Sequence, residues 1–241
     1  MKKPRRTMPT PFSRLARAFA AVTIVLLAAS CGNGDGTSSP NLLASRSDGS
    51  APIDTKIFAQ ALVALPIETL SADEIASLKF SREEEKLARD VYELFAASYT
   101  LPIFPNIASS EQTHTEAVRT LLVRYSIPDP AASTPPGMFV NPDLQALYDS
   151  LVARGRTSLV AALAVGANIE EVDIVDLTRQ LTMVDNRDIT IVFENLLKAS
   201  RNHLRSFASA LEARGIVYVP QYLPAAVYQQ IVGSPMETGA Y

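Results

Sequence analysis

Two histidines, His114 and His203, are the only imidazoles in this chain of 241 residues. His114 closes the run Glu111-Gln-Thr-His114, and residues three apart on a helix lie one turn apart on the same face, so both can reach one metal ion. His203 follows Leu196 by seven residues and precedes Phe207 by four, which predicts that it also faces a core. Because an ionisable group on a core face is costly unless it is paired or metal-bound, these positions indicate a buried cation.

Acidic side chains on two further predicted helices are expected in the same interior. Glu170 and Asp173 share one heptad phase with the leucines around them. On the first helix, the phase places Glu84 near the centre of the apolar arc and Glu85 at its edge, so phase alone favours Glu84. Di-metal carboxylate bundles use one Glu from each of two helices and Glu-x-x-His from each of the other two. Carboxylates with one imidazole per metal suit iron or manganese.

The segments that must position these side chains are predicted to be helices. The first long helix begins at the capping box Ser71-Ala-Asp-Glu74, and a short one begins at Asn141-Pro142. The expected ranges are about 71–100, 106–125, 142–154, 157–183 and 188–214. We expect an all-α fold, a four-helix bundle with one long crossover that contains the extra short helix. The rival is an up-down-up-down bundle with a decorated loop. The nearest strand candidate is a weak one at 216–219.

The ends of the chain lie outside this predicted domain, which covers residues 69–215. Residues 1–30 contain six basic residues and no acid. The basic residues lie within the first 17, and the 13 residues from 18 to 30 are uncharged and mostly apolar, which is typical of a signal peptide. Residues 31–68 are expected to form a flexible tether because their start is small and polar. Residues 216–241 are expected to pack on the domain as a tail.

The single cysteine, Cys31, directly follows the apolar stretch in Leu26-Leu27-Ala28-Ala29-Ser30-Cys31. This run resembles the lipobox of bacterial lipoproteins, in which the cysteine carries the lipid. Position −3 is Ala28, where leucine is usual, and an ordinary signal peptidase site or a free thiol in a secreted tail are the alternatives. The resemblance implies an exported protein with a lipid anchor in a bacterial cell envelope, or otherwise a periplasmic or secreted one.

Composition excludes several classes of protein. The chain is 47% hydrophobic and 20% charged, as in ordinary globular proteins. One cysteine excludes an internal disulfide, a four-cysteine zinc site and an iron–sulfur cluster. Removing the six basic residues of the start from the net charge of −3 leaves about −9. Such an acidic remainder argues against a nucleic-acid partner.

Two stretches resemble the ferritin-like superfamily. Glu85-Lys-Leu-Ala88-Arg-Asp-Val-Tyr92 is similar to its first-helix pattern Glu-x-x-Ala-x-x-x-Tyr, and Glu111-Gln-Thr-His114 to its second-helix motif. This similarity moves the expected first-helix ligand from Glu84 to Glu85. More closely, residues 82–92, 106–114 and 200–205 resemble domain-of-unknown-function family 2202, a ferritin-like family without an assigned reaction. The resemblance covers about residues 70–215.

The resemblance implies a di-metal site and a reaction class, an oxidoreductase acting on ferrous iron, oxygen or peroxide. Its metal ligands would be Glu85, Glu111, His114, Glu170, Asp173 and His203, with Glu111 shared between the metals. Ser200 stands where a glutamate would complete the second Glu-x-x-His motif, and Asp173 is one turn from Glu170, where it can supply the missing carboxylate. The alternative is that Asp173 does not compensate, and the site then binds one metal, or two weakly. Tyr92, on the face of Glu85, is expected to be a neighbour of the site or a plain core residue. Without a cysteine-rich module, any electron donor must be a separate molecule.

Other functions remain open at this stage. The second hypothesis is a non-enzymatic metal-binding or structural envelope lipoprotein with the same fold, in which both histidines would be ordinary core or surface residues. A Ser-His hydrolase has little support because the chain has no Gly-x-Ser-x-Gly elbow. Assembly as a homodimer is left open.

Overall fold

The computed structural model describes residues 42–46 and 48–238, and this part of the chain is all-α, as predicted. Its seven helices are α2 (Thr55–Ala64), α3 (Ala72–Ser98), α4 (Ile103–Arg124), α5 (Pro142–Gly155), α6 (Leu159–Gln180), α7 (Arg187–Glu212) and α8 (Ala225–Val232). An isolated bridge between Leu43 and Ile53 is the β feature of the described residues. None of the helices described is both long and apolar enough to cross a membrane. The predicted signal peptide and Cys31 lie outside the described residues.

Local signals explain where the helices begin. The predicted capping box opens α3: the Ser71 side chain accepts from the Glu74 N–H, and the Glu74 carboxylate accepts from the Ser71 N–H. The Asn141 side chain caps α5, and Pro142 occupies the first helical position. Helix α4 starts three residues earlier than expected, at Ile103. Pro105 fits there because N–H groups of a first turn have no partner within the helix.

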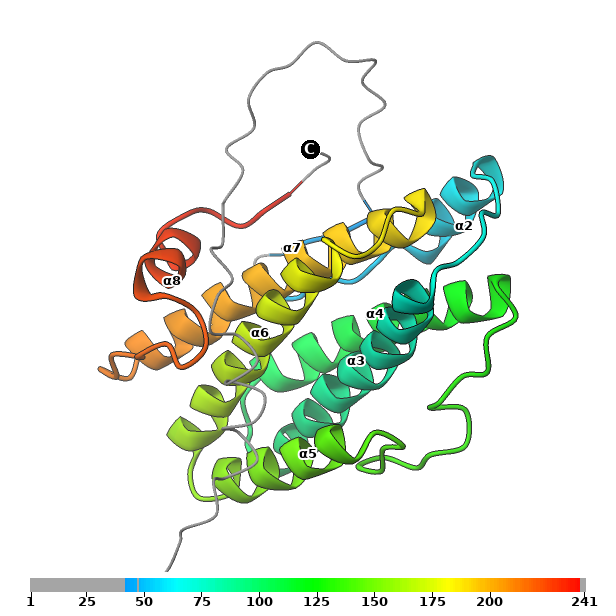
Figure 1. Cartoon of the computed structure of the whole chain (residues 1–241). Coiled ribbons are helices and arrows are strands. Elements are labelled where there is room, and N and C mark those ends of the chain that lie inside the picture. Colours follow the sequence, from blue (N-terminus) through cyan, green and yellow to red (C-terminus); the bar gives the residue numbers. More distant parts are fainter. Residues whose placement is uncertain (1–41, 47, 239–241) are drawn as a thin grey trace, which may run out of the picture. The chain divides into compact units, whose positions relative to one another are not determined.

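The four long helices pack as two antiparallel pairs, α3 with α4 and α6 with α7 (Figure 1). The pairs also contact each other, α3 with α6 and α4 with α7. Hydrogen bonds from Tyr92 to Glu170 and from Ser81 to Gln180 show that α3 and α6 run antiparallel. The connection from α4 to α6 contains α5, as the predicted crossover requires.

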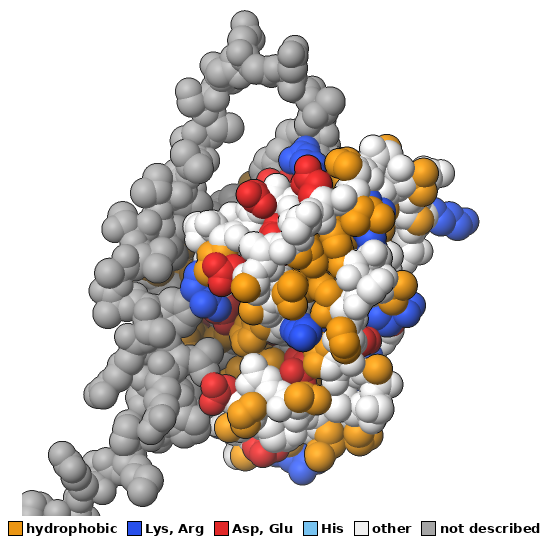
Figure 2. Space-filling model, turned by 45° about the vertical axis from the view of Figure 1, so that its right-hand side comes forward, with side chains coloured by type: hydrophobic (Ala, Val, Ile, Leu, Met, Phe, Trp, Pro, Cys, Tyr) orange, Lys and Arg blue, Asp and Glu red, His pale blue; other side chains and the backbone are white. Residues whose placement is uncertain are grey.

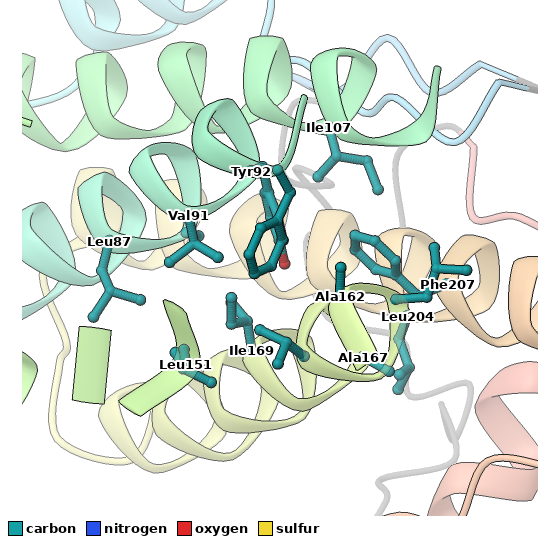
Figure 3. Close-up of a cluster of buried hydrophobic side chains, with 14 of the residues drawn as sticks. Leu87, Val91, Tyr92, Ile107, Leu151, Ala162, Ala167, Ile169, Leu204 and Phe207 are labelled. Carbon is teal, nitrogen blue, oxygen red and sulfur yellow. The ribbon is translucent and has the colours of Figure 1, made fainter. Parts of the chain in front are cut away.

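A polar layer crosses the interior between two hydrophobic clusters. The first cluster includes Leu87, Phe104 and Phe207, and the second includes Leu78, Leu121 and Leu196. The buried acids and histidines lie between the two clusters along each of the four long helices. Figure 3 shows part of the first cluster, with Tyr92 among aliphatic and aromatic side chains from several helices. The layer is therefore sealed by apolar side chains on both sides.

The segment before α2 differs from the flexible tether expected over 31–68. Residues 42–46 and 48–54, the N-terminal strap, lie against α4 and α7: the Leu42 N–H donates to Asn195, and the Ala51 N–H donates to Ser110. Leu42 and Ala51 are fully buried. The many small polar residues lower the average hydropathy of this stretch, so its few apolar residues are difficult to recognise in the sequence. These apolar residues pack in the second cluster. In the described part of 31–68, a packed strap and a short helix replace a tether.

The C-terminal tail packs on α6 and α7 through polar contacts. The Glu171 carboxylate accepts the N–H groups of Gln221, Tyr222 and Leu223. Arg205 of α7 donates to the carbonyl of Ile231 at the end of α8. The weak strand candidate at 216–219 is not a strand, and α8 is the short helix of this tail.

Candidate metal centre

Five of the predicted ligands come together in the polar layer. Glu85 comes from α3, Glu111 and His114 from α4, Glu170 from α6 and His203 from α7. Their exposed fractions are all 3% or less. They form two overlapping triads, Glu85–Glu111–His114 and Glu111–Glu170–His203, and within each triad the potential ligand atoms lie within 4.8 Å of one another. The face in Figure 2 shows no histidine surface, as expected from this burial.

Glu111 lies between the two imidazoles. Its Oε2 is 2.8 Å from Nδ1 of His114, and its Oε1 is 2.9 Å from Nδ1 of His203. Each imidazole faces one further carboxylate: Glu85 Oε2 is 3.4 Å from Nδ1 of His114, and Glu170 Oε2 is 3.5 Å from Nδ1 of His203. The two rings are nearly parallel, with centroids 5.7 Å apart. The arrangement therefore has two halves that share one carboxylate.

Several atoms of this layer that could act as metal ligands make no hydrogen bond. These atoms are Glu111 Oε1, Glu170 Oε2, and both ring nitrogens of His203, although Nδ1 of His203 is close to Glu111. Buried polar atoms almost always have a hydrogen-bond partner. Unpartnered lone pairs that converge in a sealed interior are the donor set that a cation requires, so these residues fit a metal ion.

Two other buried acids in the described residues are neutralised by basic side chains. Asp90 pairs with Lys86 and Arg89, and Asp188 pairs with Arg124. Glu85, Glu111, Glu170 and Asp173 make no ion pair with lysine or arginine in the described part of the chain; the histidines are the cationic partners available to the first three. Within the described residues, the acids of the centre therefore lack the lysine and arginine partners that neutralise Asp90 and Asp188.

Burial and mutual charge shift the pKa values in the layer. Burial opposes ionisation of Glu111, but the adjacent His114 and His203 outweigh it and hold the Glu111 pKa well below its usual range. Burial raises the pKa of Glu85 to about 8. Burial disfavours charge on His203, but Glu111 and Glu170 outweigh it and raise the His203 pKa to about 9. Without a metal, protons therefore occupy the positions that a cation would neutralise.

Two contacts orient residues of the centre. Nε2 of His114 is 2.8 Å from the carbonyl oxygen of Ala51 in the N-terminal strap. Because a carbonyl only accepts, Nε2 carries the proton, and Nδ1 of a neutral ring keeps its lone pair for the centre. The Tyr92 hydroxyl donates to Oε1 of Glu170 at 2.5 Å, which leaves Oε2 facing His203.

The remaining predicted residues have different positions. Glu84 faces Asp176 of α6, within hydrogen-bonding reach, so Glu85 and not Glu84 joins the His114 triad. Asp173 is buried beside these acids but belongs to neither triad. The hydroxyl of Ser200 donates to the carbonyl of Leu196 on its own helix.

Two participants were missed from the sequence. Asp176 follows Asp173 by three residues, and extending the stripe of Glu170 and Asp173 by another turn would have found it. Ala51 contributes through its backbone carbonyl, for which no side-chain signal exists.

The helical domain of this chain is similar to known proteins. The sequence profile of DUF2202, described as an uncharacterized protein domain, matches residues 74–235. "Uncharacterized protein MJ0754" of Methanocaldococcus jannaschii is 48% identical over 175 residues, which are 73% of this chain and 95% of that protein. The "Crystal structure of hypothetical protein MJ0754 from Methanococcus jannaschii" matches with a TM-score of 0.70 and covers 72% of this chain and 99% of that chain. The chain therefore belongs to the DUF2202 family, as the sequence resemblance predicted.

Proposed function

We propose that this chain is a ferritin-like protein that binds two divalent metal ions within its four long helices. The arrangement of the helices supports the fold assignment. Two antiparallel pairs, α3 with α4 and α6 with α7, are joined by one long connection through α5. Ferritin-like bundles have one such crossover between two helical hairpins.

The position of Glu111 between the two imidazoles carries the metal proposal. Glu85 and His114 would hold one ion, Glu170 and His203 the other, and Glu111 would serve both. Asp173 supplies a further oxygen donor near the half in which Ser200 replaces a glutamate. Oxygen donors with one imidazole per ion favour iron first and manganese second.

The proposed reaction class is oxidation of ferrous iron or reduction of oxygen or peroxide. A bound iron pair would supply the one-electron chemistry that the side chains lack. The chain itself binds and orients: Tyr92 fixes Glu170, Ala51 fixes His114, and the two hydrophobic clusters keep bulk water away. In the oxidation of ferrous iron, the iron would give its electrons to oxygen or peroxide, whereas catalytic reduction of oxygen or peroxide would draw electrons from a separate donor.

We further propose that the protein is exported and lipid-anchored through Cys31. This proposal is supported by the sequence alone, through the basic start, the short apolar stretch and the cysteine that follows it. Metabolic labelling with a fatty acid would incorporate label into the chain and not into Cys31→Ser. Equal labelling of both would contradict the anchor.

Metal content tests the central proposal. The full chain, purified in air and reconstituted with Fe²⁺ or Mn²⁺, is expected to hold two ions per chain by elemental analysis. Glu93→Gln, which removes a half-exposed acid of α3, is the matched control and should hold the same amount. Less than one ion per chain after reconstitution with either metal would overturn the proposal.

Ser200 favours a second candidate, a metal-binding protein without catalysis. Its hydroxyl is a poor ligand and bonds to its own helix, so the His203 half has one carboxylate fewer than the pattern requires. Oxygen consumption after Fe²⁺ addition separates the two. Turnover beyond one oxidation of the bound iron supports the enzyme, and full binding without oxygen consumption supports the second candidate.

A further inference from the structure

A surface cavity of about 420 Å³ opens between the first turns of α3 and the last turns of α6. Its wall includes Ser77 of α3 and Arg179 and Gln180 of α6. The antiparallel run of α3 and α6 brings these two helix ends to the same end of the bundle (Figure 1). Gln180 is 1% exposed, so it forms the floor of the cavity rather than its rim.

Polar groups continue inward from this floor. Ser81 donates to Oε1 of Gln180 at 2.8 Å, and Nε2 of Gln180 has no hydrogen-bond partner. About one turn deeper, Glu84 and Asp176 face each other across the same two helices. Oε1 of Glu84 and Oδ2 of Asp176 are buried and accept no hydrogen bond from a basic, amide or hydroxyl group, although the two carboxyl groups lie within hydrogen-bonding reach of each other.

The stripe then reaches the metal centre. Gln180, Asp176, Asp173 and Glu170 are spaced by four, three and three residues, so they follow one face of α6. The pairs 81 with 180, 84 with 176 and 92 with 170 show that this face lies against α3 along its whole length. Each of these polar residues lies about one turn from the next, so polar side chains continue from the cavity to the centre, with Leu177 of the second cluster packed beside them.

We propose that this stripe is the route by which divalent cations reach the centre, with Glu84 and Asp176 as an intermediate binding station. The inference rests on the proposed metal centre. Unpartnered carboxylate oxygens of two buried acids attract a dehydrating cation and repel anions. Arg179 lines the cavity, and one of its guanidinium nitrogens is 3.3 Å from Oδ1 of Asp176. Arg179 therefore pairs with the Asp176 carboxylate until a cation displaces it.

Loading kinetics test the route. Co²⁺ is mixed with the metal-free full chain in a stopped-flow instrument, and its visible absorption bands report arrival at the centre. Asp176→Asn removes the station's outer charge and is expected to slow loading by about 10-fold or more, because local charge raises association rates by that order. The final Co²⁺ content and the final spectrum should match those of the unchanged chain.

A substitution at Arg179, whose side chain is partly exposed, is expected to change the loading rate in the opposite direction. Arg179→Gln is expected to speed loading by roughly 3-fold, because it removes a like charge from the path of the cation. The matched control is Arg119→Gln. Arg119 of α4 makes the same i,i+3 contact, with Glu116, and its side chain is 46% exposed against 45% for Arg179. Arg119→Gln should leave the rate unchanged.

The outcomes separate this inference from the metal centre itself. No Co²⁺ bound by the unchanged chain would defeat the proposed centre, and the route with it. Normal binding with unchanged rates in Asp176→Asn and Arg179→Gln would overturn the route alone. A loss of bound Co²⁺ at equilibrium in Asp176→Asn would also overturn it, because Asp176 would then be a ligand of the centre. If Asp176→Asn fails to fold, the Arg179 and Arg119 pair still decides.

Discussion

The two halves of the centre are built from the same residue types but are supported differently. His114 has both ring nitrogens engaged, Nδ1 by Glu111 and Nε2 by the carbonyl of Ala51. His203 faces Glu111 through Nδ1, at 2.9 Å, but its Nε2 makes no hydrogen bond. In the His203 half, the supported ligand is instead the carboxylate, because Tyr92 donates to Glu170.

This difference predicts that the two proposed metal sites would have unequal affinity. Partners that orient a ligand commonly change metal affinity by about 10–100-fold. The His114 half has an imidazole held at both nitrogens and a complete Glu-x-x-His motif, whereas the His203 half has an imidazole whose Nε2 makes no hydrogen bond and Ser200 in place of a glutamate. We therefore expect the His114 half to fill first and the His203 half to fill second.

The largest effect is expected where the halves meet. Glu111→Gln keeps the shape of the side chain but removes the carboxylate charge that both halves share. We therefore expect both ions to bind at least ~100-fold more weakly, a larger loss than that from a residue that only orients a ligand. Co²⁺ titration of the full chain measures both affinities. Retention of one tight site would show that the halves do not share Glu111.

The pH dependence tests the charge of the whole layer. The Glu85 pKa of about 8 lies above the ordinary 4.5, so the stability from its neutral form is lost as the pH rises from about 4.5 to 8. The His203 pKa of about 9 lies above 6.5, so the stability from its charged form is present below 6.5 and lost as the pH rises through 9.

The metal-free chain should therefore become less stable between about pH 5 and pH 9, by on the order of 2 kcal/mol or more. A metal ion competes with these protons, so its affinity and its stabilising effect should grow over the same range. Urea unfolding with and without Mn²⁺ measures both trends. A stabilising effect of Mn²⁺ that shrinks toward high pH would contradict the assignment.

Tyr92→Phe removes the support of the His203 half alone. We expect binding of the second ion to weaken by about 10-fold, with the first ion unaffected. Tyr99→Phe is the matched control, because Tyr99 directly follows α3 and its hydroxyl donates to the carbonyl of Gly155, away from the centre. Equal weakening by both variants would indicate a general loss of packing.

Ser110→Ala loosens the strap that supports the His114 half. Ser110 accepts the Ala51 N–H at 2.9 Å, next to the carbonyl that holds His114. We expect about 3-fold weaker binding of the first ion only, since the Ile53 contact with Thr113 still holds the strap. Thr120→Val, whose hydroxyl bonds to its own helix, is the control. An effect on the second ion alone would reverse the comparison.

Much of the fold could be predicted from local patterns. Helical periodicity and the caps at Ser71 and Asn141 predicted four long helices and the short one between them, since these signals act over one or two turns. The phase of Glu111, His114 and His203 with apolar neighbours predicted that they face one interior, and the structure brings them together.

The strap could not be predicted in the same way. The strap is held by backbone groups of Leu42, Ala51 and Ile53, and a backbone donor or acceptor is the same in every sequence. The choice between Glu84 and Glu85 depended on a resemblance, because two adjacent residues differ by only 100° around a helix.

Anomalous X-ray diffraction from crystals of the chain soaked with Mn²⁺ would locate the bound ions themselves. Two peaks are expected about 3.5–4 Å apart, one on each side of the Glu111 carboxylate, with the peak beside His114 the stronger. Peaks confined to surface acids, with none between the four long helices, would contradict the proposed metal centre.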